Sequence, residues 1–358
     1  MRSWLVAFAL LCATPAGAAL CPCYSSTSAT NPNKCGIAEA RGTNPSNPEW
    51  TAIIEAVCQG PDGSGWGDGP TILPIGLGCD GSGAKVAAHF PCEIVEAIAM
   101  QETLWQQFCS ALEPADKKGN PPATIVSKDC GYGVAQVTTG MHQGETPDWD
   151  RNRVASDARY ALQVGLKILA DKWRATACVG NNDPDLVESW YLATWAYNSY
   201  SFSNNPNNPN FDAMRTVCNP NDVCTGRPYQ EKVWGWMEHP PADGRWTAMM
   251  PAYPDITEIP STSGPKPTNL TAPHCAGPTE CGSTRDVHVS RCVGGFPVED
   301  LGRTEGDGFL QTSDAGNGAD GGCGCDLGGT GSVPWRALVV IFISIAALLV
   351  LRRRHTGT

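Results

Sequence analysis

Glu102 is the acidic residue whose position in the sequence most strongly suggests chemistry. It lies in the stretch "EIVEAIAMQETLWQQF", whose apolar residues have the spacing of an amphipathic helix. At about 100° per residue, Glu102 falls between Ile98 and Val95 on the apolar face, whereas Glu93 and Glu96 fall on the half expected to face water. Burial disfavours an ionised carboxylate, so the pKa of Glu102 should rise and the residue could donate a proton near neutral pH. The alternative is a glutamate at the helix rim, or one satisfied by a buried partner.

Three later segments follow Glu102 in the chain. They are "SKDCGYGVAQVTTGM" at residues 127–141, "TWAYNSY" at 194–200 and "RPYQEKVWGWM" at 227–237. In this order and spacing they resemble the soluble lytic transglycosylase family, a branch of the lysozyme-like superfamily, over residues 50–237. The resemblance implies a lysozyme-like domain that cleaves the MurNAc–GlcNAc β-1,4 bond of peptidoglycan glycan strands and leaves 1,6-anhydro-MurNAc ends.

The first two motifs of the family can be placed residue by residue. The first is Glu followed by Ser, and here Glu102, the implied catalytic residue, is followed by Thr103. The second motif is a glycine, an apolar pair and a glutamine, matched by Gly133, Val134, Ala135 and Gln136. Glycine at positions 131 and 133 lets the backbone approach a sugar closely, and Gln136 can both donate and accept hydrogen bonds. The alternatives are a plain tight turn for the glycines and a loop cap for the glutamine.

The third motif of the family is Ala-Tyr-Asn, matched by Ala196, Tyr197 and Asn198. The Ala-Gly that usually follows is replaced here by Ser199 and Tyr200. The resemblance implies that Tyr197 hydrogen-bonds the acid, although a tyrosine on a helix is commonly a core aromatic. A late tyrosine of the family corresponds to Tyr229. The implied substrate-binding residues are therefore Thr103, Gly131, Gly133, Val134, Ala135, Gln136, Tyr197, Asn198 and Tyr229.

The presence or absence of a second catalytic carboxylate distinguishes hydrolysis from the transglycosylase reaction. Glycoside hydrolases normally use one about 5–10 Å from the acid, and the candidates by position are Asp129, Glu145, Asp148 and Asp150. Lytic transglycosylases, as a family, use the N-acetyl group of the substrate instead. The resemblance therefore implies a transglycosylase, and we expect it to need no cofactor. Two alternatives stay open: a hydrolytic, lysozyme-like or chitinase-like glycosidase, and a non-catalytic glycan-binding surface protein.

Both ends of the chain predict export. Residues 1–19 have the charge, apolar run and small residues of a signal peptide. Residues 323–358 combine a Gly-Cys stretch, an apolar span at 337–351 and terminal arginines, and they resemble the MYXO-CTERM sorting tail, with Cys323 or Cys325 as the critical cysteine. We expect the tail to enter the membrane and to be processed by a sorting protease, so that the protein reaches the cell envelope or surface.

The cysteine content fits an exported protein. Of 17 cysteines, one lies in the signal peptide and two lie in the tail. The remaining even number predicts disulfides with few or no free thiols, and the local pairs suggested by position are Cys218 with Cys224, and Cys92 with Cys109 or Cys130. Histidines are scattered and no CxxC pair occurs, so we expect no metal site.

Composition and periodicity predict a mainly α fold. The net charge of −11 repels nucleic-acid phosphates, so no nucleic-acid partner is expected. After a Cys-rich segment at residues 20–47, the catalytic domain should occupy residues 48–247, and a Pro/Gly/Thr-rich linker should occupy residues 248–322. The helices expected from apolar spacing cover residues 50–58, 93–108, 155–173 and 186–200.

Overall fold

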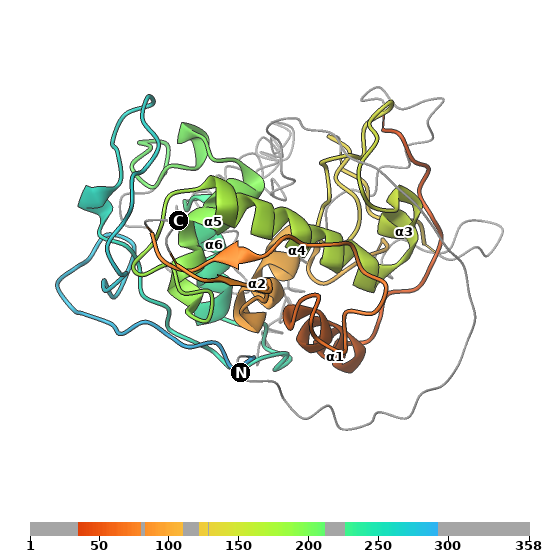
Figure 1. The fold of residues 1–358 in the computed structure, drawn as a ribbon, viewed down its shortest axis with the longest axis horizontal. Helices are drawn as coiled ribbons and strands as arrows, with labels where there is room; N and C mark the ends of the chain where they lie inside the picture. Colours follow the sequence, from red (N-terminus) through yellow and green to blue (C-terminus); the bar gives the residue numbers. More distant parts are fainter. Residues whose placement is uncertain (1–34, 80–82, 110–121, 128, 212–225, 293–358) are drawn as a thin grey trace, which may run out of the picture. The chain divides into compact units, whose positions relative to one another are not determined.

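The fold is mainly helical, as the sequence predicts. It comes from a computed structural model that describes residues 35–79, 83–109, 122–127, 129–211 and 226–292 (Figure 1). Within these residues the helices are α1 (Asn47–Cys58), α2 (Cys92–Thr103), α3 (Arg151–Ser156), α4 (Ala158–Ala175), η1 (Val187–Trp190), α5 (Tyr191–Asn198), η2 (Phe202–Asn204), α6 (Tyr229–Glu238) and η3 (Ile256–Glu258), the η elements being short 3-10 helices. The described strands, which pair antiparallel, are β1 (Ile75–Gly76) and β2 (Lys85–Val86).

Helix α2 ends at Thr103, whereas the sequence pattern predicted a helix up to Phe108. Leu104 and Trp105 both adopt left-handed backbone conformations, with φ of 57° and 62°, and such residues end a helix. Burial of the Trp105 ring, which is 2% exposed, offsets the cost of this backbone. Glu102 therefore lies on the last turn of α2, where loops can approach its carboxylate.

The helix predicted over residues 155–173 is divided into α3 and α4. Asp157 has an extended backbone, with φ −122° and ψ 111°, and its carboxylate accepts a hydrogen bond from the Tyr160 N–H at the start of α4. Asp150 caps α3 in the same way, accepting from two N–H groups of the first turn. The segment predicted as one helix over residues 186–200 begins as η1 and continues as α5.

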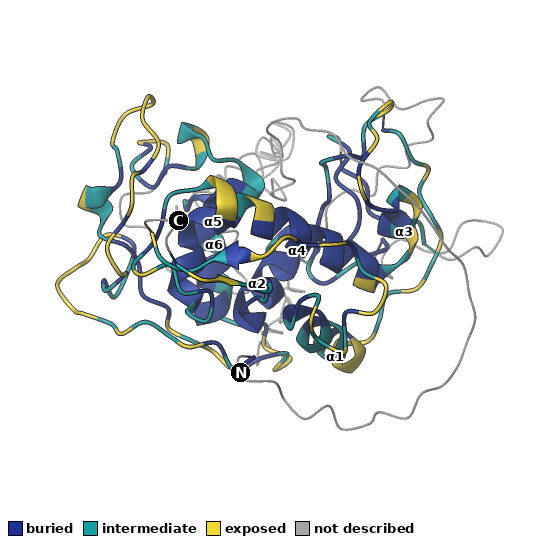
Figure 2. Ribbon diagram, in the orientation of Figure 1, coloured by how far each residue is buried: buried dark blue, intermediate teal, exposed yellow. Residues whose placement is uncertain are grey.

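Helix α2 is buried along almost its whole length, with α1 and α6 packed against it (Figure 2). The prediction that Glu93 and Glu96 face water is wrong, because they are 6% and 0% exposed. Residues far away in the chain cover them: Ser290 Oγ donates to Glu93 at 2.7 Å, and Arg291 Nη2 donates to Glu96 at 2.5 Å. Periodicity within one helix cannot reveal cover from residues 195 positions away.

The predicted linker over residues 248–322 packs against the helices in its described part. This part has little regular secondary structure, as its composition indicates, but several of its side chains join the core, namely Tyr253, Ile259, Leu270, Cys275 and Cys292. Buried Glu188 of η1 fastens it by accepting hydrogen bonds from the backbone N–H groups of Ala252 at 2.9 Å and His288 at 2.8 Å. The described part of this segment, up to Cys292, thus contributes side chains to the hydrophobic core.

The disulfides described by the structure are Cys35–Cys130, Cys92–Cys292 and Cys275–Cys281. The prediction that Cys92 pairs with Cys109 or Cys130 is therefore wrong. The Cys92–Cys292 bond closes a sequence separation of 200 residues, a range at which a sequence gives no guide to pairing. The pair predicted between Cys218 and Cys224 lies outside the described residues.

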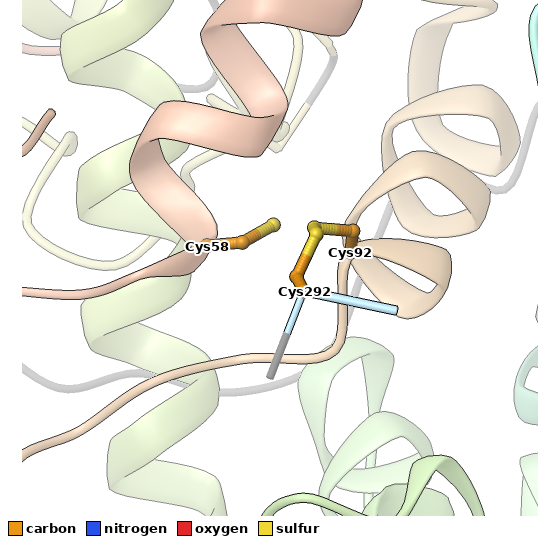
Figure 3. A group of neighbouring side chains, drawn as sticks. All are labelled: Cys58, Cys92 and Cys292. Atoms are coloured by element: carbon orange, nitrogen blue, oxygen red, sulfur yellow. A yellow bond between two sulfur atoms is a disulfide. The ribbon is translucent and has the colours of Figure 1, made fainter. Parts of the chain in front are cut away.

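Two described cysteines, Cys58 and Cys79, keep free thiols, contrary to the expectation of near-complete pairing. The Cys58 sulfur lies beside the Cys92–Cys292 disulfide, with all three sulfurs within 4.8 Å of one another (Figure 3). Burial, followed by the negative charges of nearby glutamates, raises the pKa of the Cys58 thiol well above its ordinary value. A buried thiol of this kind is a poor nucleophile.

The predicted signal peptide at residues 1–19 and the predicted tail at 323–358, with its apolar span at 337–351 and with Cys323 and Cys325, lie outside the described residues. The same holds for most of the Cys-rich segment, up to residue 34. Among the helices that the structure describes, none is long and apolar enough to cross a membrane.

Candidate active site

Glu102 is buried at the end of α2 and is 1% exposed. The Tyr229 hydroxyl, from the first turn of α6, donates a hydrogen bond to Glu102 Oε1 at 2.5 Å. Burial raises the pKa of Glu102 to about 8, although the hydrogen bond from Tyr229 and the charge of Lys232 act in the opposite direction. The negative charge of Asp129 adds to the upward shift. At neutral pH, Glu102 is therefore mainly protonated and able to act as a general acid.

Tyr197 does not donate to Glu102 as the resemblance implied. Its hydroxyl donates instead to the carbonyl oxygen of Ala135 at 2.7 Å. Burial, followed by the charge of Glu102, raises the pKa of the Tyr197 hydroxyl well above its ordinary value. The same two causes raise the pKa of Tyr229. Two neutral phenols thus lie near the acid, with Tyr229 in direct contact and Tyr197 holding the adjacent loop.

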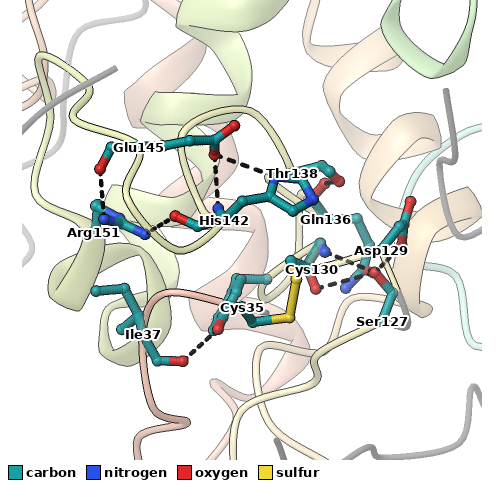
Figure 4. Close-up of a disulfide and its surroundings, with 12 residues drawn as sticks. Cys35, Ile37, Ser127, Asp129, Cys130, Gln136, Thr138, His142, Glu145 and Arg151 are labelled. Carbon is teal, nitrogen blue, oxygen red and sulfur yellow. Dashed lines mark hydrogen bonds and ion pairs between the residues drawn. A yellow bond between two sulfur atoms is a disulfide. The ribbon is translucent and has the colours of Figure 1, made fainter. Parts of the chain in front are cut away.

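That loop, described at Ser127 and over residues 129–137, contains the second motif and is held by contacts with several parts of the chain. The Cys35–Cys130 disulfide ties it to the N-terminal segment, and Ser127 Oγ accepts from the Gly131 N–H at 2.7 Å (Figure 4). Thr103 Oγ1, one residue after the acid, donates to the carbonyl oxygen of Val134 at 3.3 Å. These contacts fix the loop beside the end of α2.

Gln107 is a further positioning residue that the sequence interpretation missed. Its Oε1 accepts from the Val134 N–H at 3.0 Å, and its Nε2 donates to the carbonyl oxygens of Val154 at 2.9 Å and Ala155 at 3.1 Å. A Cβ at Gly133, which has φ of 62°, would lie 2.2 Å from Gln107 Oε1. Only glycine at position 133 leaves room for the Gln107 side chain. This packing accounts for the glycine, and no approach of a ligand is needed to explain it.

The Gln136 side chain is 6% exposed and is partly used within the loop. Its Nε2 donates to the carbonyl oxygen of Gly133 at 2.9 Å, which is the loop-capping role. Its Oε1 is buried and has no hydrogen-bond partner among the described residues. Asn198, at the end of α5, is half-buried and accepts from Asn204 Nδ2 at 2.7 Å. Both side chains thus have hydrogen-bond partners other than Glu102.

The four candidates for a second carboxylate differ in what their side chains contact. Asp150 caps α3, Asp148 pairs with Lys167 at 3.0 Å, and Glu145 accepts from the backbone N–H of His142 at 2.7 Å. Asp129 alone among the four acts on the pKa of Glu102. Asp129 Oδ1 accepts from Ser127 Oγ, and its Oδ2 is buried without a hydrogen-bond partner in the described part of the chain.

Two groups of described side chains have the spacing of metal ligands, and neither includes Glu102. They are Cys58 with Cys92 and Cys292, and His274 with Cys275 and Cys281. Each group contains a disulfide, and disulfide sulfurs lack the thiolate that binds a metal. Neither group therefore provides metal ligands at Glu102.

Comparison with known proteins gives one partial similarity. Endoglucanase C of Evansella cellulosilytica is 30% identical over 112 residues, which is 28% of this chain. The matched part spans only 14% of the endoglucanase. No family model matches the chain, and no solved structure matches it.

Proposed function

We propose that this protein is an exported peptidoglycan lytic transglycosylase in which Glu102 is both the acid and the base. The observation that carries the proposal is the buried carboxyl group of Glu102, with a raised pKa and a tyrosine hydroxyl in contact with it. The ordered motifs of the sequence support the glycan substrate. The partial similarity to an endoglucanase supports glycan cleavage without distinguishing the type of reaction.

The proposed reaction needs one carboxyl group in two states. Protonated Glu102 donates its proton to the glycosidic oxygen as the bond to the anomeric carbon breaks, and the substrate N-acetyl oxygen bonds that carbon. Glu102, now ionised, accepts the proton of the sugar 6-hydroxyl. The oxygen of that hydroxyl bonds the anomeric carbon at the same time and displaces the N-acetyl oxygen. The product is a 1,6-anhydro ring, and Glu102 is protonated again. Burial keeps the acid protonated at the start, and Tyr229 stabilises the ionised state between the two steps.

A hydrolase is the second candidate, and Asp129 is the observation that favours it. Its charge reaches Glu102, and one of its oxygens is buried without a partner among the described residues. In a hydrolase Asp129 would activate water or attack the sugar, so Asp129→Asn should abolish activity and wild-type products should have reducing ends. In a transglycosylase Asp129→Asn should have a much smaller effect, and the products should lack reducing ends.

Tyr229 provides a test of how the acid is tuned. Tyr229→Phe removes a hydrogen bond that stabilises ionised Glu102, so the pKa of Glu102 should rise further. A hydrogen bond to a charged group is worth about 1.5–3 kcal/mol, which corresponds to about one to two pKa units. The alkaline limb of the profile of kcat/KM against pH should move to higher pH by about that amount. The matched control is Tyr191→Phe, which removes a buried hydroxyl 3.1 Å from Glu231. An unchanged alkaline limb in Tyr229→Phe would show that the contact does not set the pKa of the acid.

Export and sorting are also proposals, supported by the two ends of the sequence. Replacement of both Cys323 and Cys325 by Ala should leave an unprocessed protein that keeps its tail, because the family processes the tail at such a cysteine. Mass analysis of protein from cell envelopes measures this directly. Normal processing and location of the double variant would favour a permanent membrane anchor.

A further inference from the structure

Three buried cysteines from distant parts of the chain meet beside α1 and α2 (Figure 3). Cys58 is the last residue of α1, Cys92 is the first residue of α2, and Cys292 belongs to the described C-terminal segment, residues 248–292. They are 1%, 0% and 9% exposed, and their sulfurs lie within 4.8 Å of one another. Cys92 is bonded to Cys292, whereas Cys58 keeps its thiol. A thiol so close to a disulfide is placed to exchange with one of the bonded cysteines.

Cys58 and Cys92 are held side by side without any contribution from Cys292. Helices α1 and α2 pack against each other, and the backbone N–H of Phe90, just before α2, donates to the carbonyl oxygen of Cys58 at 2.8 Å. Cys292 is 200 positions from Cys92 in the chain, far more than separates Cys92 from Cys58. Because closing a shorter loop costs less entropy, Cys58 meets Cys92 more readily while the C-terminal segment is undocked.

The last described residues of the C-terminal segment dock on α2. Ser290, two residues before Cys292, donates to buried Glu93 of this helix at 2.7 Å. Arg291 donates to buried Glu96 of the same helix. These contacts bring the Cys292 sulfur to the start of α2. The disulfide to Cys292 therefore locks the segment onto the helix that it covers.

The docked arrangement disfavours a return of Cys58 to Cys92. Burial raises the pKa of the Cys58 thiol well above its ordinary value, and the thiolate is the form that attacks a disulfide. A thiol in water has a pKa of about 8.5 and attacks more readily. Exchange is therefore easier before the C-terminal segment has closed over the group than after.

We propose that Cys92 changes its disulfide partner as the C-terminal segment docks: Cys58–Cys92 forms first, and Cys292 then displaces Cys58. The first bond forms by exchange with a small-molecule disulfide, which is reduced to two thiols as the two cysteines are oxidised. In the second step the Cys292 thiolate attacks Cys92 Sγ, the new S–S bond forms as the Cys58–Cys92 bond breaks, and Cys58 leaves as a thiolate that takes up a proton. This step consumes no oxidant, because one disulfide replaces another. The lock on α2 thus closes only in chains whose C-terminal segment has docked.

The test is oxidative refolding of the reduced, unfolded exported protein in a buffer of reduced and oxidised glutathione. Samples are taken over time, exchange is stopped with acid, free thiols are alkylated with a maleimide, and disulfide-linked peptides are identified by mass analysis after proteolysis. We expect a Cys58–Cys92 peptide to appear first and to be lost as the Cys92–Cys292 peptide accumulates. At the end of refolding Cys58 should be alkylated, as the structure requires.

Cys292→Ser removes the displacing thiol. Its final state should keep the Cys58–Cys92 bond, so that Cys58 is protected from alkylation even in denaturant. The matched control is Cys281→Ser, which breaks the disulfide to Cys275 within the same segment. This control should still end with Cys92–Cys292 and an alkylated Cys58, because it keeps the displacing thiol.

The outcomes decide the exchange directly. A wild-type time course in which Cys92–Cys292 forms with no earlier Cys58–Cys92 peptide overturns it. So does refolded wild-type protein in which Cys58 is bonded to another cysteine, or folded Cys292→Ser in which Cys58 stays a free thiol. If Cys292→Ser does not fold, the wild-type time course decides alone. Digestion of cell walls enters neither readout, so the result is independent of the proposed function.

Discussion

Glu102→Gln should lower wall-lytic activity by about 10²- to 10⁴-fold, the usual worth of general acid catalysis. Glutamine keeps the size and polarity of the side chain and can still accept a hydrogen bond from Tyr229. It has no proton that it can donate to the leaving oxygen. The measurement is the rate of release of soluble fragments from purified sacculi by equal amounts of the two proteins.

The free energy of unfolding of wild-type protein and of Glu102→Gln, measured at several pH values, shows whether the variant keeps the fold. The folded-state pKa of Glu102 is raised from 4.5 to about 8, so its stabilising protonated form is fully present below about pH 4.5 and is lost as the pH rises through 8. Wild-type protein should therefore lose stability relative to Glu102→Gln over this range, by several kcal/mol at about 1.4 kcal/mol per pKa unit. The control variant Glu280→Gln, at an exposed glutamate, should change neither activity nor this dependence. Full activity in Glu102→Gln would show that the catalytic residue lies elsewhere.

Arg291→Met should destabilise the protein by about 3–5 kcal/mol at pH 8. Arg291 is 34% exposed and pairs with Glu96, which is 0% exposed, and its Nη1 lies 3.9 Å from Glu93 Oε1. Removing the arginine leaves two buried carboxylates without their cation. Chemical denaturation followed by tryptophan fluorescence measures the change.

The effect of Arg291→Met should depend on pH in a defined direction. The pKa of Glu96 is raised to about 7 by burial, against the effect of Arg291, with further upward contributions from Glu93 and Glu55. Below about pH 5 Glu96 is protonated in the folded protein with or without Arg291, so the loss of stability should be small there and should grow as the pH rises. The control is Arg174→Met, which breaks a surface pair with Asp171 and should cost about 0–1 kcal/mol. A loss for Arg291→Met no larger than this control at pH 8 would contradict the role of the buried pair.

The sequence predicted features that depend on local pattern. The mainly helical fold and the burial of Glu102 follow from the apolar spacing around Ile98. The end of α2 was not predictable in this way, because it depends on the left-handed backbone of Leu104 and Trp105 and on burial of the Trp105 ring. Glu93 and Glu96 were misplaced for a related reason, since the residues that cover them come from the far end of the described chain.

In the site, too, the sequence motifs indicated some residues near Glu102, whereas other contacts could be seen only in the folded structure. The ordered motifs led to Tyr229, which contacts Glu102, but they assigned that contact to Tyr197. Gln107 carries no motif, although it holds the loop through three hydrogen bonds to backbone groups. A glutamine just after a helix end has many possible partners, and only the fold shows which backbone groups lie within its reach.

The nature of the cleaved ends tests the central claim most directly. Sacculi digested with the wild-type protein should release fragments that end in 1,6-anhydro-N-acetylmuramic acid, lighter by one water than hydrolysed fragments and resistant to borohydride reduction. Mass analysis before and after reduction distinguishes the two kinds of end. Glu102→Gln should release few fragments of either kind. Fragments with reducible ends would contradict the transglycosylase account and identify a hydrolase, with Asp129 as its second carboxylate.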